Sequence, residues 1–273
     1  MKRACWFLLS LLLLLPTLTS CHAIQSVPVS SRDYPNLTHL EAAEFDAEEL
    51  FRVWSSVDNP YEDYRCSVSV ENGKLVIRNA PPKPATTLVQ FDCGYFLGVN
   101  IGEFDGWVRY YPYFSNLPEA GESRLVVDEA CCGMVAIDRV SGILLTDCSG
   151  GIVFGTPSYD LGSIYWLYLN RSDLTWSWEK IAGTKGLPRA ICPAENGSGW
   201  YIVTTGELLH LSADLSLTKL TDSQMLDTIW ALDSIVEWNG KLWCGSPMGV
   251  YCFDPQTQSE TWYPMDYETY LPS

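Results

Sequence analysis

The sequence predicts an all-β body that follows a single amphipathic helix, and three observations lead to this prediction. Short runs rich in β-branched and aromatic residues, separated by turn residues, recur from residue 64 to the end of the chain. Two of these runs, residues 164–169 and 200–203, are apolar without alternation, which predicts strands with both faces buried. The 273 residues, 47% of them hydrophobic, suffice for a core of full size.

Residues 1–20 are typical of a secretory signal. Lys2 and Arg3 precede an apolar run, residues 6–15, that is about half as long as the ~20 residues a membrane-spanning helix needs. Next stands Leu18-Thr19-Ser20-Cys21, which resembles the lipobox of bacterial lipoproteins. The resemblance implies that the chain is cleaved before Cys21, that this cysteine carries the lipid (palmitate among the acyl groups), and that the exported protein is anchored to a membrane of the bacterial cell envelope.

Two other interpretations of this segment stay open. Ordinary signal peptidase cleavage after Ala23 would give a secreted soluble protein, because Cys21 and Ala23 occupy the two small-residue positions of that rule. A eukaryotic secreted protein is the other, because the glycosylation pattern Asn-x-Ser/Thr occurs at Asn36, Asn170 and Asn196.

Acidic residues outnumber basic residues by 33 to 17, which gives a formal net charge of −16. A nucleic-acid-binding protein needs clustered Lys and Arg to release counterions from phosphates, so the composition excludes DNA and RNA as partners. The same charge repels anionic lipid headgroups. We therefore expect the protein to reach the membrane through its lipid anchor.

The cysteines favour disulfides over a metal site. Of the ten, Cys5 leaves with the signal and Cys21 carries the lipid. An even set of eight remains, which predicts disulfides in an oxidising compartment. These residues are Cys66, Cys93, Cys131, Cys132, Cys148, Cys192, Cys244 and Cys252. No Cys-x-x-Cys occurs, and the mature chain adds only His22, His39 and His210, so we expect no zinc and no cofactor.

Local geometry suggests one disulfide, between Cys244 and Cys252. The two residues lie in apolar runs on either side of a turn at residues 246–249. With the turn centred near Met248, the two cysteines lie opposite each other, within the distance that a bridge requires.

The residues before the β body are expected to form a tether and a helix. Residues 21–37 are polar and contain prolines, which is typical of a flexible tether. Residues 38–58 are predicted to be helical, since Thr38 and Glu41 have capping-box spacing and the apolar residues that follow recur at helical spacing. Asn59-Pro60 ends the helix.

The body, residues 64–273, begins with a predicted hairpin. Residues 66–70 and 74–77 flank Asn72-Gly73, the pair of residues that best favours a two-residue hairpin turn. The clearest later motif spans Gly240 to Tyr263, which reads Gly-Lys-Leu-Trp-Cys-Gly, then Gly-Val-Tyr-Cys-Phe-Asp-Pro, then Ser-Glu-Thr-Trp-Tyr. It resembles the repeats of bacterial β-propellers, which implies four-stranded blades stacked around a channel.

Three looser copies precede this motif, at residues 95–128, 142–180 and 199–220. With Gly98, Thr146, Thr204 and Gly245 as equivalent positions, the intervals are 48, 58 and 41 residues, around the period of about 40 to 50 expected for blades. We therefore expect a β-propeller-like fold of four to five blades, the fifth built partly from the hairpin at residues 66–77.

The sequence contains few signals of catalysis. His39 and His210 are the only histidines of the body, and the Gly-x-Ser-x-Gly, P-loop and His-Glu-x-x-His motifs are absent. No residue is assigned a catalytic role. Carboxylates at strand ends could perform acid and base work in a propeller glycosidase. The candidates are Glu103, Asp105, Asp128, Glu129, Asp138, Asp147 and Asp160.

Aromatic side chains are abundant, with 11 Trp, 15 Tyr and 9 Phe. Most are expected to fill the core. Four tryptophans near turns are candidate stacking platforms for a glycan or a protein ligand: Trp107, Trp178, Trp238 and Trp262.

Three functions are compatible with these features. The favoured one is a membrane-tethered, exported binding or interaction module with an acidic surface and no enzymatic activity. A propeller-type carbohydrate-active enzyme is the first alternative, and converging carboxylates in an aromatic pocket would favour it. An inhibitor or immunity-type protein acting on a basic exported target is the second alternative.

Overall fold

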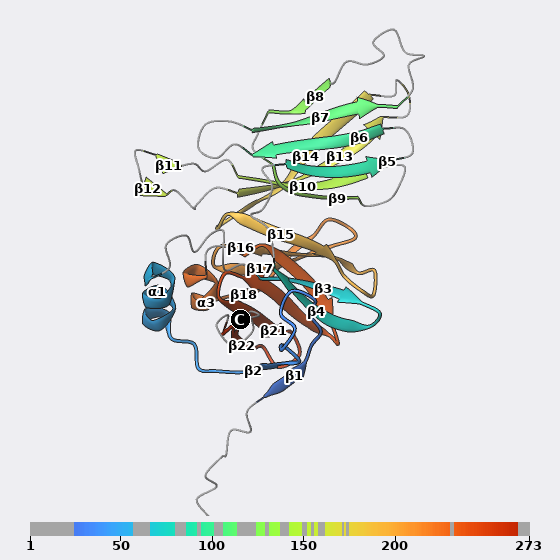
Figure 1. Ribbon diagram of the computed structural model, residues 1–273. Helices are drawn as coiled ribbons and strands as arrows, with labels where there is room; N and C mark the ends of the chain where they lie inside the picture. The colour runs from blue at the N-terminus through green and yellow to red at the C-terminus, as the bar shows by residue number, and fades with distance from the viewer. Residues whose placement is uncertain are drawn as a thin grey trace, which may run out of the picture.

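The computed structural model describes residues 25–56, 66–79, 86–91, 94–100, 106–113, 124–128, 131–136, 142–148, 152–153, 156–157, 162–170, 172, 175–229 and 232–266. These residues form antiparallel sheets with two helices, α1 and α3 (Figure 1). The prediction of a β-rich antiparallel body is confirmed.

Four sheets of four strands follow one another along the chain, each with its strands in an antiparallel order. The first sheet contains β5 (Thr86–Phe91), β6 (Gly94–Asn100), β7 (Gly106–Pro112) and β8 (Arg124–Val127). The second contains β9 (Cys131–Ala136), β10 (Gly142–Cys148), β13 (Gly162–Asn170) and β14 (Thr175–Thr184). A small hairpin, β11 (Ile152–Val153) and β12 (Thr156–Pro157), lies between β10 and β13 in sequence.

The third and fourth sheets complete the series. The third contains β15 (Pro188–Pro193), β16 (Gly199–Thr204), β17 (Glu207–Ser212) and β18 (Leu217–Asp222). A short helix, α3 (Gln224–Thr228), joins it to the fourth, which contains β19 (Ser234–Trp238), β20 (Lys241–Ser246), β21 (Gly249–Asp254) and β22 (Ser259–Pro264). The three-strand motifs recognised in the sequence match the last three strands of each sheet. The first strands, β5, β9, β15 and β19, were not predicted.

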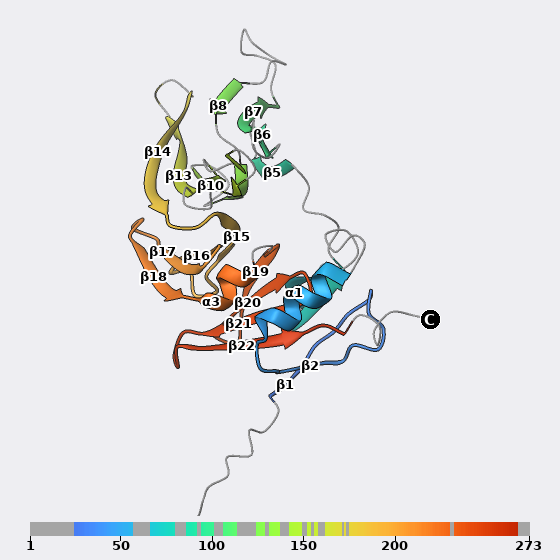
Figure 2. The same ribbon diagram turned by 90° about the vertical axis from the view of Figure 1, so that its left-hand side faces the viewer.

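The four sheets are stacked face against face around an arc, as Figure 2 shows. Their first strands lie side by side in chain order, β5 beside β9, β9 beside β15 and β15 beside β19. Apolar side chains fill each contact between neighbouring sheets. Phe96 and Val108 of the first sheet pack against Leu167 of the second, and Ile164 of the second sheet packs against Ile202 of the third.

The third sheet shows why its strands lack alternation. Ile202 and Val203 are neighbours on β16, and both have fully buried side chains. Ile202 faces the second sheet, while Val203 packs with Tyr251 and Phe253 of the fourth sheet. Successive residues of a strand point to opposite faces, so both faces of the third sheet are buried. This confirms the prediction made from the apolar run at residues 200–203.

The far face of the fourth sheet is covered by residues from the N-terminal part of the chain. The predicted hairpin forms as β3 (Cys66–Glu71) and β4 (Lys74–Asn79), and its turn residues Asn72 and Gly73 have φ of 51° and 74°, as a two-residue hairpin turn of this type requires. Strand β3 lies beside β19. The hairpin thus packs at the end of the stack of sheets.

The predicted tether is wrong for its described part, residues 25–37. Strand β1 (Ser26–Pro28) pairs with β2 (His39–Glu41), and Ser30 bridges to Val76 of the hairpin. Tyr34 and Leu37 are buried against the fourth sheet. These large apolar side chains, spaced among polar residues, fasten the segment to the body.

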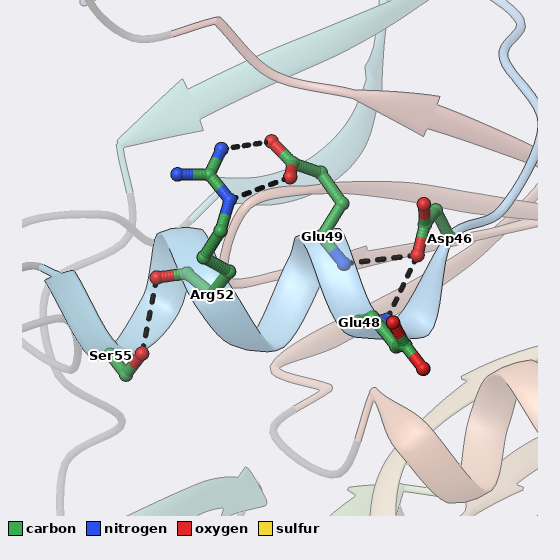
Figure 3. Close-up of polar contacts among 5 residues, drawn as sticks. All are labelled: Asp46, Glu48, Glu49, Arg52 and Ser55. Carbon is green, nitrogen blue, oxygen red and sulfur yellow. Dashed lines mark hydrogen bonds and ion pairs between the residues drawn. The ribbon is translucent and has the colours of Figure 1, made fainter.

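The predicted helix starts later than expected. The proposed capping box at Thr38 is wrong, because residues 39–41 form β2, and α1 extends over Ala47–Ser56. Asp46 caps this helix, since its Oδ1 accepts hydrogen bonds from the backbone N–H groups of Glu48 and Glu49, both at 2.9 Å (Figure 3). Residues 57–60, where the helix was predicted to end, lie outside the described residues.

Arg52 and Glu49 form a bidentate pair on α1 (Figure 3), with nitrogen–oxygen distances of 2.6 and 2.8 Å. Both side chains are exposed, so the pair adds little to the stability of the helix. Leu50 attaches the helix to the core, because it packs against the apolar clusters on both sides of the fourth sheet.

The predicted Cys244–Cys252 disulfide is wrong because the strand register differs from the expected one. The turn between β20 and β21 is centred between Pro247 and Met248, so Cys244 pairs with Tyr251 and Cys252 pairs with Trp243. A shift of one residue moves a side chain to the other face of a sheet, and the two thiols therefore point to opposite faces.

Cys192, Cys244 and Cys252 are all buried free thiols. The Cys66 thiol donates to the backbone oxygens of Ser246 and Gly249, at 3.1 and 2.9 Å. These cysteines act as small buried side chains within the core.

Burial of both faces of β16 predicts the effect of two substitutions. Ile202→Asp and Val203→Asp should each cost several kcal/mol of unfolding free energy, out of a total of roughly 5 to 15, because each places an unpaired carboxylate between two sheets. Urea denaturation followed by circular dichroism measures this loss. Thr218→Asp, on the exposed side of β18, is the control and should change stability little. If one face of the sheet were exposed to solvent, one of the two core substitutions would leave stability unchanged, and this result would contradict the prediction.

Candidate functional site

The outer face of the first sheet is the candidate functional site. Its inner face packs against the second sheet through Phe96 and Val108. Pairing across the strands places Leu88 beside Leu97, Leu97 beside Arg109 and Arg109 beside Leu125, all pointing to the outer face. We call this surface the terminal face. Its members are Leu88, Gln90, Tyr95, Leu97, Trp107, Arg109, Tyr111 and Leu125, with Tyr113 at its margin, while Val99 on the same side is buried.

Three tyrosines form a continuous aromatic surface at one end of the terminal face. Tyr95 on β6 pairs directly with Tyr111 on β7, and their rings stack with centroids 4.8 Å apart and planes 4° apart. Tyr113 follows β7, and the centroid of its ring lies 6.0 Å from that of Tyr95. Tyrosine rings give a partner apolar area together with a hydroxyl group for hydrogen bonding.

Trp107 and Arg109 form the second element of the terminal face. They lie two residues apart on β7 and so point to the same side of the sheet. The guanidinium carbon of Arg109 lies 5.1 Å from the centre of the Trp107 ring, within the range of a cation–π interaction. This contact holds a positive, planar group on an aromatic surface.

The edges of the terminal face are apolar and exposed. Leu88 on β5 is 59% exposed, Leu125 on β8 is 50% exposed and Tyr113 is 45% exposed. Exposed apolar side chains are unremarkable when scattered singly, but a contiguous group marks a surface for interaction.

The strand positions of the terminal face hold no carboxylate, in a chain that holds 33 acidic residues, and the exposed Asp128 directly follows Val127 at the end of β8. The one charged group at these strand positions is Arg109. Aromatic residues and Arg are enriched at the centres of protein interfaces, while Asp, Glu and Lys are depleted there. The composition of this face therefore matches that of a binding surface.

A glycine allows the two tyrosine-bearing strands to pack closely. A Cβ atom at Gly94, the first residue of β6, would lie 2.4 Å from the backbone oxygen of Tyr111 and 2.7 Å from the Tyr110 ring. A larger residue here would push apart the strands that carry Tyr95 and Tyr111.

The four tryptophans predicted as stacking platforms have different environments. Trp107 belongs to the terminal face. Trp178 on β14 is 49% exposed and contacts Tyr165 edge to face. Trp238 is half-buried, and its indole N–H donates to the backbone oxygen of Gly73 at 3.1 Å, which joins β19 to the hairpin turn.

The prediction for Trp262 is wrong. This side chain is 4% exposed and packs edge to face against Phe45, with ring centroids 5.7 Å apart. It also lies over Gly249, where a Cβ atom would come within 2.4 Å of the indole ring. Its position on β22 next to the N-terminal segment, far away in sequence, causes this burial.

Other predicted residues lie mostly outside the described part of the chain. Cys21 does, as do Glu103, Asp105, Glu129, Asp138 and Asp160. Asp128 is exposed after β8, and Asp147 lies within β10. Sequence reasoning missed the tyrosines and the two edge leucines of the terminal face. The alternation of Trp107, Arg109, Tyr111 and Tyr113 is the signal that indicates a shared face.

The two histidines of the body contact neutral groups. His39 is exposed, with Nδ1 2.9 Å from the Thr38 hydroxyl. His210 on β17 has Nε2 3.3 Å from the Ser198 hydroxyl and its ring 5.0 Å from Tyr201. Desolvation and then the negative charge of Glu237 raise the pKa of Tyr201, so this phenol stays protonated at neutral pH.

The buried thiols stay protonated as well. Burial is the main cause that raises the pKa of Cys192 and that of Cys252 to about 12. Burial raises the pKa of Cys244 well above its ordinary value. The thiolate is the nucleophilic form, so none of these three cysteines is an activated nucleophile. Within the described residues, no three side chains of His, Cys, Asp and Glu come together in a way that could hold a metal ion.

Comparison with known proteins adds little to this description. No protein-family model matches the sequence, and no curated protein is similar to it. Among solved structures, a putative 6-phosphogluconolactonase from Bacteroides fragilis is 11% identical, with a TM-score of 0.35 over 73% of this chain and 81% of that chain. A catalytically inactive virginiamycin B lyase from Staphylococcus aureus with quinupristin is 11% identical, with a TM-score of 0.35 over 78% and 88%.

A functionally unknown protein from Desulfotomaculum acetoxidans is 12% identical, with a TM-score of 0.34 over 73% of this chain and 78% of that chain. Similarities as low as these assign no activity to the chain. Separately, neither helix in the described residues is long and apolar enough to cross a membrane.

The raised thiol pKa values predict that the protein loses stability in alkali. Unfolded cysteine loses its proton near its ordinary pKa of 9.0, whereas folded Cys192 and Cys252 keep theirs to about 12. The stabilisation is therefore complete below pH 9 and is lost as the pH rises from 9 to 12, at about 1.4 kcal/mol per pH unit for each thiol.

Urea denaturation at pH 8, 9, 10 and 11 measures this slope. Tyrosines and lysines titrate over the same range, so the matched comparison is Cys252→Ala, which should reduce the slope by about 1.4 kcal/mol per pH unit. An equal slope in the parent and the variant would contradict the assignment.

Proposed function

We propose that this protein is an exported binding module, anchored to a bacterial membrane by a lipid on Cys21, whose body is a β-propeller-like stack that binds a partner protein through the terminal face. The observation that carries the proposal is the terminal face itself, a contiguous aromatic and apolar surface whose described positions hold no carboxylate.

The arrangement of the sheets supports the propeller-like part of the proposal. Each four-stranded sheet corresponds to one blade, with β5, β9, β15 and β19 as the innermost strands. The β3–β4 hairpin, beside β19, takes the place of a partial fifth blade. Large apolar side chains between the sheets fill the spaces between blades, as this architecture requires.

The chemistry of the terminal face supports binding over catalysis. Stacked tyrosines, a tryptophan under an arginine and two exposed leucines stabilise a complex by burying area and by cation–π contacts. A general acid and base pair would need carboxylates or histidines, and the described positions of this face have neither.

The anchor is tested by Cys21→Ser. This variant lacks the thiol that accepts the lipid, so we expect it to leave the membrane fraction and to appear in soluble form with the melting temperature of the parent. Fractionation of cells, with immunoblotting of each fraction, gives the answer. Stable attachment through lipid needs several acyl chains, and the variant would carry none. Retention of the variant in the membrane fraction would therefore contradict the lipid anchor.

The binding surface is tested by photo-crosslinking in intact cells. A photoreactive amino acid at position 125 of the full chain should give a defined adduct, because Leu125 is half exposed at the edge of the terminal face. The same amino acid at position 218, on the exposed side of β18, is the control. Trp107→Ala should abolish the adduct at position 125. Equal adducts at both positions would contradict a specific binding surface.

A further inference from the structure

We propose that the terminal face binds the terminal face of a second copy of this chain, which gives a symmetric dimer on the membrane. The inference names the partner at the site described above, and it rests on the proposed function insofar as the lipid anchors hold both copies at one membrane. Three observations support a second copy: how the other end of the stack is covered, where the charges lie, and how residues are arranged across the face.

At the other end of the stack, the described residues form no comparable surface. The far face of the fourth sheet is covered by the hairpin and by the N-terminal segment, whose Tyr34, Leu37 and Leu40 are 1%, 2% and 2% exposed. In a head-to-tail arrangement, the apolar terminal face of one copy would contact the hairpin and the N-terminal segment that cover the fourth sheet of the next copy. A pairing of identical faces around a two-fold axis is the arrangement that remains, and it closes at two copies.

The charge distribution favours the same contact. Each copy has a formal net charge of −16, so two copies repel each other wherever their acidic surfaces meet. The strand positions of the terminal face carry no negative group, and Asp128 stands at its edge, directly after β8. Mobile ions screen charges further apart than about 8 Å at physiological salt. Contact through this face therefore keeps the repulsion between two copies small.

Arg109 decides which way the two sheets meet. Leu88, Leu97, Arg109 and Leu125 form one row across the four strands. If the two-fold axis lay in the plane of the interface and perpendicular to the strands, each residue of the row would face the same residue of the second copy. The two Arg109 side chains would then collide. An axis parallel to the strands reverses the row, so that Leu88 lies on Leu125 of the second copy and Arg109 lies on Leu97 of the second copy. We infer the parallel axis.

The size of the face sets the strength of this dimer. Four strands about 4.8 Å apart, each about 20 Å long, give a footprint of roughly 400 Å² per copy, about half of the ~800 Å² per partner of a standard stable interface. Such a contact is transient in dilute solution. Two copies anchored at one membrane have a higher effective concentration, which favours the dimer there.

The test uses cysteine cross-linking of the full, lipid-anchored chain in cell membranes. Leu88→Cys and Leu125→Cys are made in two differently tagged copies of the chain and produced together, and a bismaleimide whose length matches the ~10 Å between packed sheets is added. We expect a cross-linked pair that contains both tags. Each variant produced alone should cross-link at least tenfold less, because like positions lie a further three strand spacings, ~14 Å, apart along the sheet.

Two controls complete the experiment. The parent chain, treated with the same bismaleimide, reports any cross-link from native cysteines. Val70→Cys on β3, 37% exposed and away from the terminal face, replaces Leu88→Cys in the matched control and should give no cross-link with Leu125→Cys. Thermal melts of the variants must match that of the parent, which establishes that each is folded.

The outcomes separate this inference from the proposed function. Absence of the mixed cross-link, together with a photo-adduct at position 125 that contains a different protein, overturns the dimer and leaves the binding module in place. Strong cross-linking of Leu88→Cys with itself overturns the parallel axis. Absence of both the cross-link and the adduct contradicts the dimer and the binding module together.

Discussion

The burial of both faces of each sheet is the constraint on which this structure depends. A four-stranded sheet with apolar side chains on both faces is stable only when each face is covered, as Ile202 and Val203 show on opposite sides of β16. The sheets meet this requirement by stacking in chain order. The requirement then falls on the two sheets at the ends of the stack, which have a neighbour on one side only.

The two ends meet this requirement differently. At the fourth sheet, the chain supplies its own cover, since Tyr34, Leu37 and Leu40 of the N-terminal segment pack there with Val68 of the hairpin. At the first sheet, the outer face keeps the alternation of a strand with one buried side, and its apolar residues remain exposed at Leu88 and Leu125. The candidate binding surface is thus a consequence of the stacking that stabilises the rest of the body.

The same stacking explains the chemistry of the cysteines. Cys192 and Cys244 lie in the core between the third and fourth sheets, and Cys252 lies on the opposite face of the fourth sheet. Burial keeps these thiols protonated, and Cys244 and Cys252 point to opposite faces of their sheet. This core excludes solvent and so protects the thiols from oxidation, as the export that we propose would require.

Local sequence was sufficient where neighbouring residues determine the structure. Asn72-Gly73 determined the β3–β4 turn, and apolar runs without alternation indicated β13 and β16 as strands with both faces buried. Tertiary structure decided whatever depends on residues far apart in sequence. A half-residue shift of one turn separated Cys244 from Cys252, and contact with Phe45 buried Trp262. Strand pairing decided where the helix starts and how residues 25–37 pack. The terminal face is exposed because the first sheet lacks a neighbour on that side. The sequence alone cannot distinguish these cases, because an apolar side chain looks the same in sequence whether another sheet or solvent covers it.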